Sequence, residues 1–238
     1  MTLSPPERAK HAAAADAVKL VEDGMVLGLG TGSTAAFFVE LLAERLKETG
    51  WRVECIATSS ATKELARKAG LNLIELDDAL TLDLTIDGAD ELDDDLDLIK
   101  GGGGALLQEK IVANASTRFV VIADASKHVR TLGAFPLPVE IVRFGWQTTA
   151  RQVRATLVGG HEGGHEVRLR TRDGKPFVTD EGHYIIDLVL QRIEDAGMLD
   201  FDLRQIPGVV ETGLFLGMAN MAILGNPDGT VQRIERDE

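Results

Sequence analysis

Basic residues and long apolar runs are scarce in this sequence of 238 residues, and each shortage excludes a class of protein. Its 25 Lys and Arg stand against 38 Asp and Glu, which gives a formal net charge of -13. Surfaces that bind nucleic acids or anionic membranes need clustered basic side chains, so we expect neither partner. No apolar run approaches the ~20 residues that cross a bilayer, and the N-terminus lacks the basic-then-apolar layout of a signal peptide.

Cysteine is almost absent, because Cys55 is the only one. A disulfide within the chain and a cysteine-based zinc site are therefore excluded. The apolar neighbours of Cys55 favour a small buried residue over a nucleophile, and a single thiol suits a reducing cytosol. We expect a cytoplasmic, globular protein, in line with 44% hydrophobic and 26% charged residues.

Apolar strands alternate with helices in the first part of the chain. Strands are predicted at 25–29, 53–57, 82–87 and 119–123, and helices at 5–22, 35–48, 61–69 and 105–115. This alternation predicts a mostly parallel, Rossmann-like sheet with helices on both faces. Ligands of such sheets bind beyond the carboxyl ends of the strands. The segments predicted there are polar or glycine-rich: 30–34, 58–60, 87–91 and 124–127.

The pattern changes after the proline-rich stretch 133–138. Strands are predicted at 139–144, 166–170, 183–190, 209–216 and 219–224, with helices at 148–157 and 200–205 and a turn at 173–174. Short strands around such a turn favour an antiparallel sheet. We predict a smaller inserted α+β domain of the ferredoxin-like kind at 131–206. The catalytic α/β domain would then comprise residues 1–130 and 207–238.

The segment Gly30-Thr31-Gly32-Ser33-Thr34 follows a strand and opens a helix. Glycines, hydroxyls and the amides of a helix N-terminus together favour a phosphate site. A dinucleotide fingerprint would need an acidic residue where the next strand ends, and Thr58-Ser59-Ser60 stands there instead. A tight turn capped by Ser33 or Thr34 is the structural alternative and stays open at this point.

Carboxylates gather between residues 87 and 97. Asp87-Gly88-Ala89-Asp90-Glu91 stands at and just beyond a predicted strand end, so Asp87 and Asp90 are candidates for a ligand site. An EF-hand counted from Asp93 would need Gly at 98 and Glu at 104, but Leu98 and Gly104 stand there, so calcium is not expected. We interpret the acids of 93–97 as a solvated face.

Lys100-Gly101-Gly102-Gly103-Gly104 precedes an apolar helix that carries Glu109. Four glycines cost conformational entropy, and a flexible linker would not normally lead straight into a buried helix. A carboxylate among Ala105, Leu106, Val112 and Ala113 should be partly desolvated, which would raise its pKa towards that of a general base. An exposed Glu109 paired with Lys110 is an equally good interpretation of these residues alone.

His161-Glu162-Gly163-Gly164-His165 matches the zinc-protease pattern H-E-x-x-H. That chemistry needs a helix to bring both imidazoles to one face. Gly159, Gly160, Gly163 and Gly164 make a helix improbable, so we predict a glycine-rich hairpin turn and no metal site.

Several of these segments together resemble ribose-5-phosphate isomerases of the A type. The matching stretches keep the family's order and spacing: GLGTGSTA (28–35), TIDGADE (85–91), IKGGGGALLQEK (99–110), IADASKHV (122–129), FPLPVE (135–140) and IPGVVETGLF (206–215). The resemblance implies interconversion of ribose 5-phosphate and ribulose 5-phosphate in the non-oxidative pentose phosphate pathway. It also implies an α/β domain with an inserted α+β domain, and an enediolate intermediate formed without a metal or another cofactor.

The resemblance assigns roles to particular residues. Glu109 would be the proton acceptor, and Lys100 with the amides of Gly101, Gly102 and Gly103 would stabilise the enediolate oxygen. Asp87, Gly88, Ala89 and Asp90 would surround the sugar hydroxyls and assist ring opening. Thr31, Gly32, Ser33, Thr34 and Lys127 would be further substrate contacts. The inserted domain of the family often forms oligomer contacts, so we expect a homodimer or homotetramer.

Two rival functions remain at this stage. A non-catalytic sugar-phosphate sensor would need an output module, for which the sequence has no spare segment or basic helix, and it would have no use for Glu109. A nicotinamide-dependent oxidoreductase would need the acidic residue that is missing near Thr58.

Overall fold

The computed structural model describes residues 3–160 and 164–236 of the chain. They form two compact units, each built from segments that are far apart in sequence. Unit 1 comprises 1–89, 108–127 and 218–238, and unit 2 comprises 90–107 and 128–217. Unit 2 therefore exceeds the inserted domain that we predict at 131–206, since it includes 90–107 and short flanks at 128–130 and 207–217.

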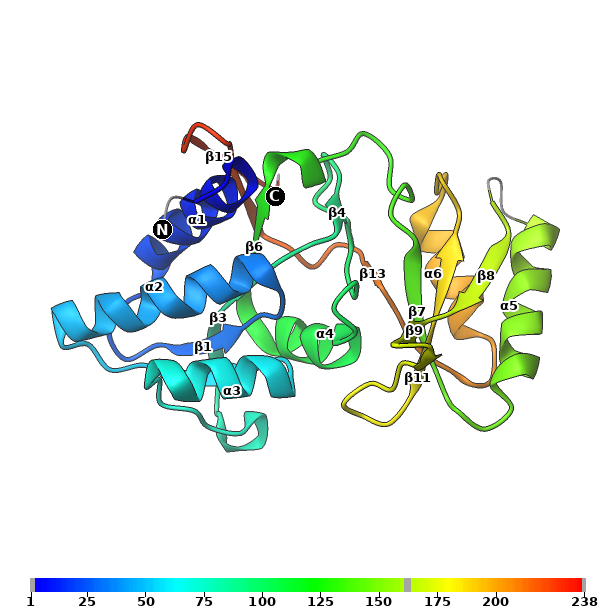
Figure 1. Cartoon of the computed structure of the whole chain (residues 1–238), viewed down its shortest axis with the longest axis horizontal. Coiled ribbons are helices and arrows are strands. Elements are labelled where there is room, and N and C mark those ends of the chain that lie inside the picture. The colour runs from blue at the N-terminus through cyan, green and yellow to red at the C-terminus, as the bar shows by residue number, and fades with distance from the viewer. Residues whose placement is uncertain (1–2, 161–163, 237–238) are drawn as a thin grey trace. The chain divides into compact units, whose positions relative to one another are not determined.

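Unit 1 contains a sheet of six strands in the order β15-β14-β6-β3-β1-β2 (Figure 1). The strands are β1 (Val26–Leu29), β2 (Glu54–Ala57), β3 (Leu82–Asp87), β6 (Ser116–Asp124), β14 (Met221–Gly225) and β15 (Val231–Glu235). All neighbouring pairs are parallel except β14 with β15. The mostly parallel sheet predicted from the alternating pattern is thereby confirmed.

Helices cover both faces of this sheet, as predicted. They are α1 (Pro5–Ala17), α2 (Ser33–Thr49), α3 (Ser60–Ala69) and α4 (Leu106–Ala115), with 3-10 turns at Val18–Leu20, Leu76–Asp78 and Ala125–Lys127. Leu27 and Leu29 of β1 belong to the core cluster that contains Phe38 of α2. A Cβ on Gly28 would lie 2.8 Å from Cγ1 of Val112 in α4, so α4 packs closely on the opposite face.

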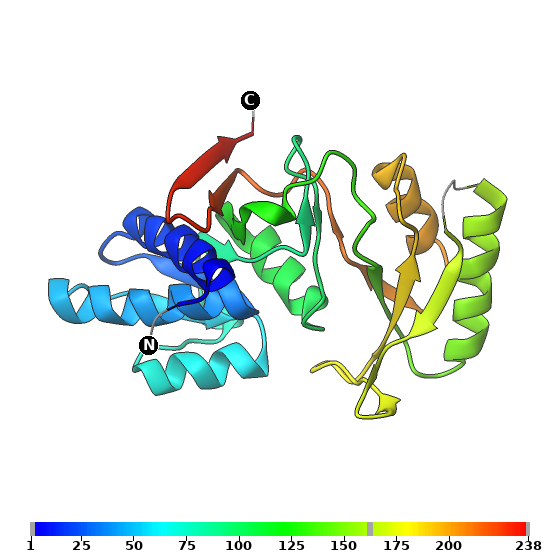
Figure 2. The same cartoon turned by 45° about the horizontal axis from the view of Figure 1, so that its top comes forward.

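The two ends of unit 1 are joined through α1 and the C-terminal hairpin. In Figure 2, α1 (dark blue) lies beside the hairpin of β14 and β15 (red). Nε of Arg233 in β15 donates to Oδ2 of Asp16 in α1 at 2.6 Å, and Nε of Arg8 donates to the carbonyl oxygen of Pro227 at 3.0 Å. This ion pair holds the pKa of Asp16 below its usual range. A Cβ on Gly225 would lie only 1.9 Å from the carbonyl oxygen of Ala9, so helix and strand are in direct contact.

Unit 2 contains an antiparallel sheet of four strands in the order β12-β7-β11-β8. The chain runs through β7 (Leu137–Ile141), α5 (Trp146–Gly160), β8 (Glu166–Leu169), β11 (Tyr184–Val189), α6 (Ala196–Arg204) and β12 (Val209–Thr212). This βαββαβ succession is that of ferredoxin-like domains, as predicted. The remaining strands form a hairpin, β9 (Thr171–Arg172) with β10 (Lys175–Pro176), and a small sheet of β13 (Leu214–Phe215), β5 (Leu98–Ile99) and β4 (Glu91–Leu92).

The two faces of the unit 2 sheet differ. Val139 of β7 and Ile186 of β11 point into the apolar cluster that includes Val153 of α5 and Leu203 of α6. Since side chains alternate along a strand, Pro138, Glu140 and Asp187 lie on the opposite face. Both helices therefore pack on one face, and the other face is left for polar contacts.

Several predicted element bounds are wrong. The helix expected at 5–22 ends as an α-helix at Ala17, and the one expected at 200–205 begins at Ala196, where Asp195 accepts a hydrogen bond from the Met198 amide. The strand expected at 209–216 is split at Gly213 into β12 and β13. A Cβ on Gly213 would lie 2.4 Å from the carbonyl oxygen of Lys100, so the chain passes close to another segment there.

Gly225 in unit 1 and Gly159 in unit 2 allow a matched test of how closely a glycine is packed. We expect Gly225→Ala to lower the free energy of unfolding by about 2 kcal/mol, because its Cβ would overlap the backbone of Ala9. Gly159 lies at an exposed position of α5, and a Cβ there would have no other atom within 4 Å. Gly159→Ala should therefore raise the free energy of unfolding by about 0.5–1 kcal/mol. Urea unfolding of both variants measures the difference. Equal stability of Gly225→Ala and the unaltered protein would contradict the close packing of α1 on β14.

Candidate active site

In unit 1, Asp87 connects two loops at the carboxyl edge of the parallel sheet. It ends β3 and is fully buried. Its Oδ1 accepts hydrogen bonds from the amides of Thr31 at 3.0 Å and Gly88 at 2.7 Å. A Cβ on Gly30 would lie 2.1 Å from that oxygen, so only glycine fits there. The structure thus brings Thr31, Asp87 and Gly88 together, as the sequence predicted for segments at this edge.

Hydrogen-bonded hydroxyl groups hold the Gly30–Thr34 turn on its buried side. Oγ1 of Thr31 lies 2.8 Å from Oγ1 of Thr58, 2.8 Å from Oγ of Ser59 and 3.1 Å from Oγ1 of Thr62. Oγ1 of Thr62 also donates to the carbonyl oxygen of Gly30 at 2.9 Å. Thr58, Ser59 and Thr62 are all buried. The Thr31 side chain is therefore part of the internal scaffold of the turn.

The open side of the same turn suits an anion. Gly32 has φ +114° and is the N-cap residue of α2, which begins at Ser33. No side chain caps this end of the helix with a hydrogen bond. The alternative of a turn capped by Ser33 or Thr34 is thereby wrong. Gly32 and Ser33 are exposed, and Nζ of Lys10 lies 3.0 Å from Oγ of Ser33. Exposed amides at a helix N-terminus beside a cation form an anion site.

The acidic segment after Asp90 is mostly structural. Glu91 is buried and accepts hydrogen bonds from the amides of Gly133 at 2.7 Å and Phe135 at 2.5 Å. Asp93 accepts from the amides of Asp95 and Asp97, and burial raises the pKa of its carboxyl. Asp94 and Asp95 are exposed, so the predicted solvated face holds for them and is wrong for Asp93.

The four glycines after Lys100 form an ordered loop in unit 2. Gly101 and Gly104 have φ of +103° and +89°, and the Gly104 amide donates to the Gly101 carbonyl oxygen at 3.0 Å. The Gly102 amide donates to Oδ2 of Asp90 at 2.7 Å, and a Cβ on Gly102 would lie 2.6 Å from Oδ1 of the same carboxylate. Left-handed backbone and close approach both require glycine here. The alternative of a flexible linker is therefore wrong.

The other predicted site residues are placed within their own units. Lys100, in unit 2, is 2% exposed; its amide donates to the Gly213 carbonyl oxygen and its Nζ lies 5.4 Å from the centre of the Phe215 ring. Glu109, in unit 1, is 4% exposed on the predicted helix, which contradicts the interpretation of an exposed glutamate. Gly88, Ala89 and Lys127 are half-buried, and Gly103 is exposed.

The histidine-rich segment 161–165 falls mainly on residues 161–163, which lie outside the described part of the chain. α5 includes Gly159 and Gly160, so the expectation that these glycines exclude a helix is wrong for those two. Among residues 3–160 and 164–236, no group of three or more His, Cys, Asp and Glu is arranged to hold a metal ion. No helix in the same residues is long and apolar enough to cross a membrane.

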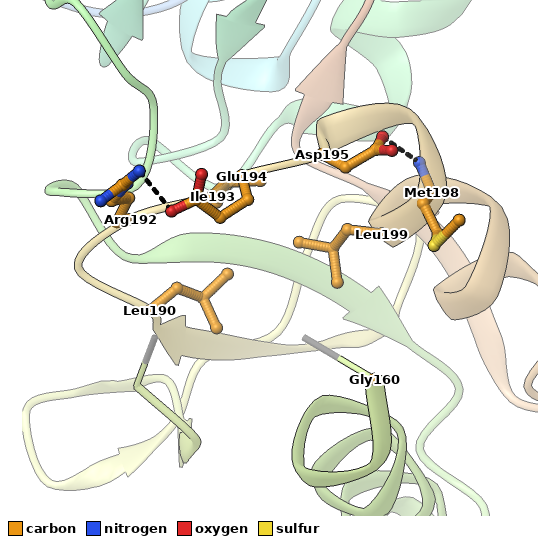
Figure 3. A pocket seen from close by; sticks show the side chains of 8 residues that line it. All are labelled: Gly160, Leu190, Arg192, Ile193, Glu194, Asp195, Met198 and Leu199. Atoms are coloured by element: carbon orange, nitrogen blue, oxygen red, sulfur yellow. Dashed lines mark hydrogen bonds and ion pairs between the residues drawn. The ribbon is translucent and has the colours of Figure 1, made fainter. Parts of the chain in front are cut away.

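A cavity of about 440 Å³ in unit 2 contains none of the predicted site residues (Figure 3). It is lined by Gly160, Leu190, Arg192, Ile193, Glu194, Asp195, Met198 and Leu199. Arg192 points to Glu194, with which it forms an ion pair, and Asp195 points to the Met198 amide. The charged side chains of Arg192, Glu194 and Asp195 are thus already bonded to other residues that line the cavity.

The sequence analysis missed several buried polar residues on the open face of the unit 2 sheet. Glu140 is 1% exposed and accepts hydrogen bonds from Thr179 and His183, each at 2.9 Å; burial raises the pKa of its carboxyl. Arg170 is paired with Asp187. The alternation of apolar and polar residues in the strands could have indicated Glu140 and Asp187. Cys55, by contrast, is buried as predicted, and burial raises the pKa of its thiol to about 12.

The parallel sheet, its glycine-rich turn and the buried acids define an α/β fold of the kind found in enzymes, with a turn at the carboxyl edge that suits an anion. The family model of ribose 5-phosphate isomerase A (phosphoriboisomerase A) matches residues 54–229. The chain belongs to this family. The ribose-5-phosphate isomerase A of Dinoroseobacter shibae is 56% identical over 230 residues, which are 97% of this chain and 88% of that one. That of Cereibacter sphaeroides is 57% identical over 96% of this chain and 87% of its own length.

Solved structures of the family agree with the fold. Ribose 5-phosphate isomerase from Plasmodium falciparum matches with a TM-score of 0.90 and 37% identity, over 96% of this chain and 98% of that one. A D-ribose-5-phosphate isomerase solved in complex with phospho-erythronic acid matches with a TM-score of 0.87 and 37% identity. The match covers 95% of this chain and 97% of that one. The chain therefore interconverts ribose 5-phosphate and ribulose 5-phosphate, a reaction of the pentose phosphate pathway.

The hydroxyl group beneath the turn yields a first functional test. We expect Thr62→Val to raise KM for ribose 5-phosphate about 3- to 10-fold, because a net hydrogen bond is worth about 0.5–1.5 kcal/mol and the turn loses its donor to Gly30. Thr81→Val, at an exposed position before β3, is the control and should leave KM unchanged. Steady-state kinetics compare them, and an unchanged KM for Thr62→Val would contradict the role of this hydroxyl.

Proposed function

We propose that Glu109 is the base of the isomerisation. It would take the proton from C2 of the opened aldose and return it to C1, while O1 gains a proton and O2 loses one. Atoms and electrons then balance without an external oxidant or reductant. The observation that carries this role is the burial of Glu109 at 4% exposure on α4, directly after the glycine loop in sequence. A desolvated carboxylate is a stronger base than one in water.

Lys100 and the amides of Gly101, Gly102 and Gly103 would stabilise the negative oxygen of the enediolate. Lys100 is 2% exposed, so little water competes for its charge. Fixed donors in such surroundings stabilise developing charge far more than they would in water. The ordered backbone of the loop supports the same role for the Gly101 and Gly103 amides, whereas the Gly102 amide already donates to Asp90.

The remaining predicted residues would bind the sugar and its phosphate. Asp87, Gly88, Ala89 and Asp90 would contact the hydroxyls and assist ring opening. Thr31, Gly32, Ser33 and Thr34 would hold the phosphate, with Lys127 as a further contact. The exposed amides and the Lys10 ammonium at this turn support a phosphate there. The hydroxyl of Thr31 bonds to Thr58 and Ser59 and its amide donates to Asp87, which favours the exposed Gly32 and Ser33 for direct contact with the phosphate.

The protein would work without a metal or another cofactor, as a cytoplasmic homodimer or homotetramer. The sequence supports the first point, since its single cysteine and scattered histidines offer no usual ligand set. The resemblance to the family supports the second.

Replacing Glu109 tests the proposed base. Glu109→Gln keeps the shape of the side chain and removes its basic oxygen, so kcat should fall by about 10² to 10⁴. The dissociation constant for ribose 5-phosphate and the unfolding midpoint should change little. Stopped assays and calorimetric titration measure these quantities.

The matched control is Glu64→Gln, at an exposed position of α3 where Glu64 pairs with Lys68. It should keep the full kcat. If Glu109→Gln also keeps substantial kcat, the base lies elsewhere, and Asp87 is the next candidate to replace.

Chelation tests metal independence. Activity should be unchanged after dialysis against excess EDTA, because the proposed chemistry uses only side chains and backbone amides. Full loss of activity, restored by a divalent cation, would show that the metal-free mechanism is wrong.

A further inference from the structure

Arg170 contacts the glycine loop directly, although it lies about 70 residues away in the sequence. It follows β8, and its amide donates to the Ile185 carbonyl oxygen at 2.8 Å. Its Nη1 donates to the carbonyl oxygens of Gly101 at 2.6 Å and Gly102 at 3.3 Å. All these residues belong to unit 2.

A second side chain fixes the direction of this guanidinium. Nε of Arg170 donates to Oδ2 of Asp187 at 3.0 Å, and Nη2 donates to Oδ1 of the same carboxylate. The side chains of Arg170 and Asp187 are only 15% and 20% exposed. Such a two-point pair holds the guanidinium plane in place and leaves Nη1 to the loop.

The planar peptide bond converts contacts to the carbonyls into an orientation of the amides. In a trans peptide the carbonyl oxygen of one residue and the amide of the next point in opposite directions. When Arg170 holds the Gly101 oxygen, the Gly102 amide is directed away from Arg170, and it donates to Asp90. The Gly102 oxygen directs the Gly103 amide away from Arg170 in the same manner.

Neighbouring side chains pack closely against the glycine loop and restrict its backbone conformation. A Cβ on Gly101 would lie 2.9 Å from Leu106 and 3.3 Å from Pro138, and one on Gly104 would lie 2.4 Å from the Phe177 ring. Phe177 in turn lies under the guanidinium of Arg172, 4.5 Å from its ring centre. The segment from β8 to β10 thus lies along one side of the loop.

We propose that Arg170, held by Asp187, is a positioning residue that orients the Gly103 amide for the enediolate oxygen and keeps the Gly102 amide on Asp90. This inference rests on the proposed role of the glycine loop. Arg170 would act through the loop, because four of its five N–H donors are used by Asp187 and by the two carbonyl oxygens. Lysine could not replace it, since a single ammonium cannot hold a carboxylate and two carbonyls in a fixed plane.

The test compares Arg170→Gln with Arg192→Gln, which removes an exposed arginine of the same unit that pairs with Glu194. Misplacing the amides by about 1 Å should lower kcat about 10- to 100-fold. KM for ribose 5-phosphate should change by less than about threefold, since the phosphate turn is untouched. Arg192→Gln should match the unaltered protein. Arg170→Lys should resemble Arg170→Gln.

Phospho-erythronic acid serves as a probe of the amide orientation. Its carboxylate carries charged oxygens on a planar carbon, as the enediolate does. We expect its inhibition constant to rise in Arg170→Gln by the same factor by which kcat/KM falls. A merely structural role would weaken phosphate binding and lower the unfolding midpoint as well, so inorganic phosphate and thermal unfolding are measured alongside.

Asp187→Asn tests the link between the two side chains. If Asp187 acts only through Arg170, Asp187→Asn should lower kcat by a factor similar to that of Arg170→Gln. The double variant should then lower kcat no further than Arg170→Gln alone. Additive losses would contradict the link.

The proposal for Arg170 and the proposal for Glu109 can fail independently of each other. Unchanged kcat and inhibition constant in Arg170→Gln would overturn the positioning role, whatever Glu109→Gln shows. Full activity of Glu109→Gln would overturn the proposed base and leave the loss in Arg170→Gln to be measured independently.

Discussion

The carboxylate of Asp87 is the constraint on which the carboxyl edge of the unit 1 sheet depends. One buried oxygen accepts two amides, from Thr31 after β1 and from Gly88 after β3. Two loops that would otherwise move separately are thereby fixed to one another. The close approach leaves no room for a side chain on Gly30, which explains why the turn begins with glycine. A residue that resembles a sugar ligand in sequence therefore also supports the Gly30–Thr34 turn.

Local patterns were sufficient to predict most of the fold. Leu82–Asp87 alternates apolar and polar residues and Phe119–Ala123 is a continuous apolar run, and both form strands. The predicted turn at Asp173-Gly174 is also present, with positive φ angles at both residues. The turn between β1 and α2 was also predictable, because Gly30 and Gly32 stand between an apolar strand and a helical pattern. Glu109 was equally compatible with burial and exposure until the structure showed it buried.

What the sequence could not predict depends on partners that are distant along the chain. Nothing near Arg170 indicates that it binds carbonyls of Gly101 and Gly102, and nothing near Glu91 indicates that it accepts the amides of Gly133 and Phe135. Contacts of this kind follow from the topology, which a single sequence does not reveal. The start of α6, by contrast, was predictable from a local signal, since Asp195 directly before it is a typical N-cap residue.

The chain passes between the two units four times, at 89/90, 107/108, 127/128 and 217/218. Neither unit therefore corresponds to one continuous stretch of the gene. A recombination event that replaced residues 128–217 as a block would bring in a foreign Arg170 and Pro138 and leave the old glycine loop behind. Exchange of whole modules, a common source of new enzymes, is thus restricted here, and the loop and its supports must be inherited together.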